Sequence, residues 1–377
     1  MKNILPHFVL VLFASSALLQ AQLSIPSDGS DGALNVTTNN HVIDLSQAVT
    51  GTWDANNSAN TTKGIFDPVK RAIVFKYTSV NINANRTVTF INHPSRAPVV
   101  WLVQGNVTIA GTLSLNGATA PGNNMLAEPG PGGFRGGATG SLGTGSGLGV
   151  SGATTGSSTA SYASSYGNPS ILPLIGGSGG QGGTAGGGAI LIASAGSIQV
   201  SGSITSLGLS GSFPNYSAGS GGAIRLVANS ISGTGTIDVR NDGRIRLEAN
   251  SVSGNVVTLP QTIAVAPATP PTIWPGNDAP TVKITNVDSS AAPAVPTAPL
   301  DLAADVGVST NGASTVTIQT TNFPINGVVQ VRAAPKFGTA AWTTAVFQSG
   351  DATSANWTAT VTFPTGFTTL QARATVP

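Results

Sequence analysis

The sequence predicts an all-β protein in which a three-sided parallel β-helix, a solenoid of short strands, is followed by a small antiparallel β-sandwich. Strand-like phrases that alternate apolar and polar residues recur along the chain. Glycine accounts for 48 of the 377 residues, whereas only 8% are charged. The composition changes after residue 260, which indicates a separate C-terminal region.

Residues 1–21 have the order of a secretory signal peptide. Lys2 precedes an apolar run at Phe8–Ala14, and small residues lead to Ala21. The run is shorter than the roughly 20 residues that cross a bilayer. We therefore expect a secreted, extracellular or cell-surface protein with no membrane span after signal removal. An uncleaved N-terminal anchor is the alternative.

The repeat occupies residues 72–259. Its clearest copies begin at Ala223 and Arg244, and each alternates apolar and polar residues before turning through Ala-Asn-Ser into a second strand. One coil cannot bury its apolar row alone, so coils stacked about 4.8 Å apart must build the core together. Weaker copies begin at Ala72, Val99 and Ala189.

The alternation also predicts which side chains face the core. The expected inward positions are Ile73, Val100, Ile190, Ile224 and Ile245, with Leu226 over Leu247. Residues 22–71 are expected to cap the N-terminal end of this stack. An antiparallel sandwich is the alternative for 72–259, but hairpin turns do not join these strands regularly.

A glycine-rich insertion at 118–187 interrupts the repeat after a third strand, where a solenoid tolerates added residues. Its composition is typical of a flexible low-complexity loop, so we expect it to add little stability. In the alternative interpretation, its apolar stretch Ile171–Ile175 packs on the solenoid and makes the insertion structural.

Residues 260–280 are expected to be a proline-rich linker, and residues 281–377 an immunoglobulin-like β-sandwich. Trp342 and Trp357 are expected in its core. The predicted strands are Thr281–Val287, Ser314–Thr320, Val328–Ala333, Thr343–Phe347, Trp357–Phe363 and Leu370–Val376.

The repeat phrases resemble the coils of adhesin-like and pectate-lyase-like parallel β-helix proteins. The phrase from Gly221 to Leu226 is similar to phrases in large glycine-rich exported bacterial proteins. The resemblance covers roughly residues 70–259. It implies a surface or adhesion protein, although a minority of this fold are polysaccharide lyases or hydrolases.

Residues suited to acid–base catalysis are scarce. Glutamate occurs only at Glu128 and Glu248, and outside the signal peptide histidine occurs only at His41 and His93. Glycoside hydrolysis needs paired carboxylates, and the chain has no cysteine for a thiolate nucleophile. A net charge of +2 gives no reason to expect nucleic-acid binding.

One charged cluster is a candidate binding site for an anionic sugar. The repeat places Arg225 and Arg246 on the same outward face, which Glu248 shares. A solvated ladder of surface ion pairs is the preferred interpretation. It predicts that replacing Arg225 with alanine has almost no effect on stability. The whole candidate set is Arg225, Asp238, Arg240, Asp242, Arg244, Arg246 and Glu248.

The run from Asp28 to Gly32 is similar to a short calcium loop, with Asp28 and Asp31 as candidate ligands. It lacks a distal glutamate, and a polar turn is the preferred interpretation. No other cofactor is expected.

These features predict a secreted, non-catalytic surface or extracellular-matrix protein of the adhesin type. The alternative is a carbohydrate-active protein, either an enzyme or a glycan-binding module, that uses the outward Arg/Asp/Glu row. The expected partners are extracellular polysaccharide or cell-surface components.

The signal peptide can be tested on exported protein. The order of charge, apolar run and Ala21 predicts a mature chain that begins at or near Gln22. N-terminal sequencing of secreted material checks this, and an intact Met1 would contradict it.

Overall fold

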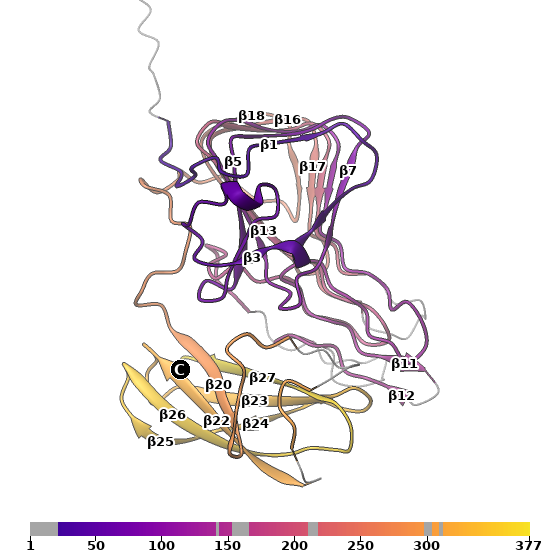
Figure 1. Ribbon diagram of the computed structural model, residues 1–377, viewed down its shortest axis with the longest axis vertical. Helices are drawn as coiled ribbons and strands as arrows, with labels where there is room; N and C mark the ends of the chain where they lie inside the picture. Colours follow the sequence, from indigo (N-terminus) through magenta and orange to yellow (C-terminus); the bar gives the residue numbers. More distant parts are fainter. Residues whose placement is uncertain (1–21, 141–142, 153–165, 210–217, 298–303, 309–311) are drawn as a thin grey trace, which may run out of the picture.

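The computed structural model describes residues 22–140, 143–152, 166–209, 218–297, 304–308 and 312–377. The predicted signal peptide lies outside these residues. The described chain is all-β, with parallel sheets in its N-terminal two thirds and antiparallel sheets near the C-terminus (Figure 1).

Three rows of parallel strands form the upper part of Figure 1. The first row contains β5 (Ala72–Tyr77), β8 (Val99–Val103), β13 (Ala189–Ser194) and the first halves of β16 (Ala223–Gly233) and β18 (Arg244–Gly254). The second row contains β1 (Ala33–Val36), β6 (Ser79–Ile82), β9 (Val107–Ile109), β14 (Ser197–Val200) and the second halves of β16 and β18. The third row contains β2 (His41–Asp44), β7 (Thr87–Ile91), β10 (Thr112–Ser114), β15 (Ser203–Thr205), β17 (Thr236–Asp238) and β19 (Val257–Leu259).

Each predicted repeat copy supplies one strand segment to every row. The N-terminal region adds β1 and β2, which the repeat pattern did not reveal and which pair with β6 and β7. It also adds the 3₁₀ turns η1 (Leu45–Gln47) and η2 (Ser58–Asn60), and the short strands β3 (Val49–Thr50) and β4 (Ile65–Asp67). Strand β4 pairs antiparallel with β5 and covers the outer edge of the first row.

The strands pair in register, so equivalent side chains form columns. Ile224 pairs with Ile190 and with Ile245, as the sequence predicts. Val100 was assigned to this column wrongly, because Val99 pairs with Ile190. All five residues of β8 are apolar and buried, so alternation could not reveal which of them face inward.

Both faces of the first row are buried. The inward face joins the main core, where Phe75, Tyr77 and Trp101 are fully buried. The outward face forms a second cluster, in which Val100 and Leu191 pack with Leu23 and Ile273 from outside the repeat. Burial of each large apolar side chain contributes about 1.5–3 kcal/mol, which makes these clusters the main source of stability.

The described parts of the glycine-rich insertion are closely packed, which differs from the flexible loop that the composition of the insertion predicts. Its segments run side by side and exchange backbone hydrogen bonds. Phe134 donates to the carbonyl of Gly177 at 3.0 Å, and Gly186 donates to that of Phe134 at 3.0 Å. Ile171 is 2% exposed and packs on Ala189 and Ala223, as the alternative interpretation proposed.

Glycine is required in this layer by the distance between neighbouring backbones. A methyl group added at Gly137 would lie 1.9 Å from the carbonyl oxygen of Gly145, and one at Gly186 would lie 2.0 Å from that of Gly177. No side chain fits in such a gap. The composition that suggested a flexible loop therefore allows a dense, hydrogen-bonded layer of chain.

The C-terminal region contains two antiparallel sheets that share one hydrophobic core. One sheet has the order β21 (Ser290–Ala291), β20 (Thr281–Val287), β22 (Ala313–Thr321), β26 (Ser354–Thr362) and β25 (Val346–Gly350). The other has the order β24 (Ala341–Thr344), β23 (Val328–Pro335) and β27 (Thr368–Thr375).

Two predictions about this region need correction. The strand expected at Thr343–Phe347 is divided between β24 and β25, which belong to different sheets. Trp357 is 3% exposed in the core as predicted, but Trp342 is only half-buried. The Trp342 ring packs instead against the guanidinium of Arg373, with 4.1 Å between the guanidinium carbon and the ring centre.

A buried arginine joins the glycine-rich layer to the C-terminal sheets. Arg332 of β23 is fully buried and donates to the carbonyl oxygens of Gly147, Gly149 and Gly152 at 2.9, 3.0 and 3.1 Å. Ser146 Oγ donates to the Gly338 carbonyl at 3.0 Å in the same contact. The two regions are therefore held together by hydrogen bonds as well as by the chain between them.

The glycine layer predicts an unequal response to alanine. Gly186→Ala should lower the free energy of unfolding by about 1–3 kcal/mol, because the added methyl overpacks the layer. Gly307→Ala is the matched control, since nothing lies within 4 Å of the added atom. Thermal melting followed by circular dichroism measures both, and an equal shift in the two variants would contradict the packing described here.

Candidate functional site

The predicted charged row separates into two groups. In the first, Glu248 Oε1 accepts hydrogen bonds from Arg225 Nε at 2.8 Å and from Arg246 Nε at 2.6 Å. Register pairing places Arg225 directly beside Arg246, so two like charges lie on neighbouring strands. Glu248 holds them together.

This group is buried, and the expectation of a solvated ladder is wrong. The side chains of Arg225 and Glu248 are 2% and 3% exposed, whereas that of Arg246 is 28% exposed. The segment at 169–174 lies over this face, and the Pro169 carbonyl accepts a bond from Arg246 Nη1 at 3.3 Å. Burial lowers the pKa of Arg225, and its Nη1 is buried without a hydrogen-bond partner.

The remaining candidates lie around the turn between β17 and β18. Asp238 and Arg240 form their own ion pair, with 2.7 Å between Oδ2 and Nη2. Asp242 lies in the turn with a left-handed backbone. Arg244 donates to the carbonyl of Tyr166 and lies over its ring, and burial lowers the pKa of Arg244.

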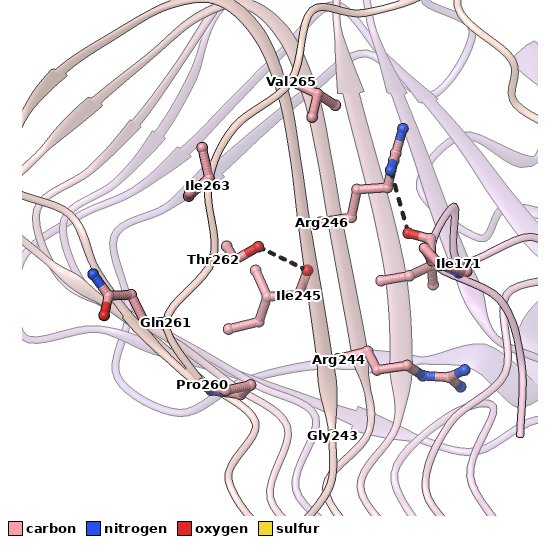
Figure 2. A pocket seen from close by; sticks show the side chains of 11 residues that line it. Ile171, Gly243, Arg244, Ile245, Arg246, Pro260, Gln261, Thr262, Ile263 and Val265 are labelled. Carbon is pink, nitrogen blue, oxygen red and sulfur yellow. Dashed lines mark hydrogen bonds between the residues drawn. The ribbon is translucent and has the colours of Figure 1, made fainter. Parts of the chain in front are cut away.

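A hollow of about 320 Å³ lies at the edge of β18. Figure 2 shows Arg244 and Arg246 on one side of Ile245, together with Ile171, and the segment from Pro260 to Ile263 on the other side; Val265 lies above Ile245. Most of the lining is apolar, and its charges are the two guanidinium groups. The hollow can therefore accept a small anionic group beside an apolar surface.

The segments at 169–171 and 260–265 were not foreseen as part of this site. They carry no motif, and they reach β18 only through tertiary packing: Val265 bonds to the backbone of Leu247 at 3.0 Å, and Ala249 bonds back to Val265 at 2.8 Å.

Comparison with known proteins finds no matching family model, curated protein or solved structure.

The lining residues include no carboxylate and no imidazole, so the hollow has no acid–base pair of its own. His93 is stacked on Phe66 with ring centres 4.2 Å apart, and burial lowers its pKa. Glu128 forms ion pairs with Arg96 and Arg135. His93 and Glu128 therefore make local contacts and are not among the residues that line the hollow.

The two carboxylates of the candidate calcium loop bind other groups of the protein. Asp28 Oδ2 lies 3.0 Å from the ammonium group of Lys76, and Asp31 accepts bonds from the Lys76 backbone at 2.7 Å and from the Asn57 amide at 2.8 Å. Burial raises the pKa of Asp31. The calcium hypothesis remains a prediction. No group of three or more His, Asp or Glu side chains suited to a metal occurs among the described residues.

Within the described residues, no helix has the length and apolar character that crossing a bilayer requires.

The buried charge group predicts a large effect of removing its anion. Glu248→Ala should lower the free energy of unfolding by about 3–5 kcal/mol, because Arg225 would remain buried without a counter-charge. Lys63→Ala is the control: this residue is exposed, and little change is expected. Chemical denaturation of both variants measures the difference, and equal losses would refute the burial assigned to this group.

Proposed function

We propose that this chain is an exported, non-catalytic surface or extracellular-matrix protein of the adhesin type, built on a rigid three-sided β-solenoid that carries an immunoglobulin-like C-terminal module. Export rests on the sequence of residues 1–21.

The strand rows support the solenoid. Every row pairs strands in the order of the chain, and each copy passes through the rows in the same sequence. The columns of buried aliphatic side chains and the close-packed glycine layer both favour a stiff scaffold.

A single observation carries the non-catalytic part of the proposal. In the buried group of Arg225, Arg246 and Glu248, the one carboxylate belongs to Glu248 and is 3% exposed between the two arginines. A general base must reach its substrate and exchange protons with it. A carboxylate in this position instead reduces the repulsion between Arg225 and Arg246 by pairing with both.

A degradation screen tests this proposal directly. Purified protein should release no reducing ends or unsaturated products from plant, algal and bacterial polysaccharides, and cell fractionation should place it at the surface or in the medium. Turnover of any polysaccharide would overturn the non-catalytic assignment, and retention in the cytoplasm would overturn export.

The hollow favours glycan binding as a second candidate function. Two guanidinium groups beside an apolar wall suit a sugar that carries a carboxylate. Arg246→Gln should then abolish any binding to uronate-containing glycans on an array. Arg240→Gln, outside the hollow, should leave it unchanged. Equal binding by both variants would exclude this site.

A further inference from the structure

On the outer face of β7, β10, β15 and β17 in the third row, two columns of side chains carry a hydroxyl group at every position except Asp238. The inward residues Val88, Leu113, Ile204 and Ile237 are fully buried. Successive residues of a strand point to opposite sides, so the residues flanking each of them face outward. The first outward column is Thr87, Thr112, Ser203 and Thr236, and the second is Thr89, Ser114, Thr205 and Asp238.

These columns form a regular two-dimensional array. In-register parallel strands place neighbouring hydroxyls about 4.8 Å apart along a column and about 6.7 Å apart across the two columns. Every Ser and Thr of the array is half-buried, so each is held by its neighbours and still reaches solvent. Ser203 Oγ donates to Thr112 Oγ1 at 3.1 Å, which fixes both side chains before any partner arrives.

The middle of the array is uncharged. The outward positions of β7, β10 and β15 in these columns are all Thr or Ser. Asp238, at one end, is neutralised by Arg240. None of these three strands turns an aromatic ring outward, so the stacking contact that commonly holds sugars is absent from this face. Strands β7 and β17 lie at the right side of the upper part of Figure 1.

We propose that this face of β7, β10, β15 and β17 binds ice. Water oxygens in hexagonal ice repeat at separations close to one strand spacing in one direction and to a two-residue step in the other. Each hydroxyl both donates and accepts a hydrogen bond, so the array can take the place of a patch of lattice water. A preformed, rigid array loses little conformational entropy when it adsorbs.

The second row supplies a matched control. Its outward column contains Asn81, Thr108, Gln199 and Ser232, whose side chains differ in length and so present an uneven surface. Thr108 and Thr112 belong to the same repeat copy, and both are half-buried. Lysine at either position adds the same bulk and charge, but only Thr112→Lys interrupts the hydroxyl array.

The test uses purified mature chain. Ice-crystal shaping and thermal hysteresis in a nanolitre osmometer should be present in the unmodified protein, lost in Thr112→Lys and retained in Thr108→Lys. Thr205→Val removes one hydroxyl at nearly constant volume and should reduce the hysteresis, and it decides the question if Thr112→Lys is misfolded by circular dichroism. Ser203→Thr keeps the hydroxyl and should preserve activity.

Absence of ice shaping in the unmodified protein would overturn the proposal, as would equal loss in the two lysine variants. Binding to crystalline cellulose or chitin that Thr112→Lys abolishes, without ice activity, would assign the face to polysaccharide instead. All of these outcomes leave the surface-protein proposal standing, because that proposal depends on export and on the absence of turnover.

Discussion

In-register pairing of parallel strands is the constraint on which the rest of the structure depends. Each residue lies beside its counterpart in the next copy, so Ile190, Ile224 and Ile245 form one continuous apolar column. The same rule acts on the outward side, where it aligns hydroxyls such as Thr112 and Ser203. Because equivalent residues lie next to each other, an interaction between them is repeated along the row, whether it is favourable or unfavourable.

The charged row shows the unfavourable case. Register places Arg225 beside Arg246 and so forces two cations together on a face that other segments cover. Glu248 makes this arrangement tolerable, because one of its oxygens accepts bonds from both arginines. The Glu248 carboxylate therefore bonds to groups of the protein itself. Only the more exposed parts of Arg246 and its neighbour Arg244 remain available beside the hollow.

In the glycine-rich layer, backbone segments rather than side chains pack directly against one another. Gly137 and Gly186 have no side chain. A neighbouring segment of the chain therefore lies so close to each of them that its carbonyl oxygen occupies the space of a methyl group. At the border of the layer, Arg332 of the C-terminal sheet binds three backbone carbonyls. A buried guanidinium needs several acceptors, and closely packed glycine supplies them without bulk.

The sequence by itself determined the strands of the five repeat copies, the pairing of Ile224 with Ile245 and the alignment of Arg225 with Arg246. These follow from a period of two within strands and from a recurring phrase between them. It could not decide the face of Val99 and Val100, since an unbroken apolar run has no period. Tertiary structure alone decided that Arg225 is buried and that the glycine-rich stretch is packed. Both depend on contacts between segments distant in the chain. Pro169 accepts a bond from Arg246, the neighbour of Arg225, and Gly187 donates to the carbonyl of Ser220. Local composition carries no record of such contacts.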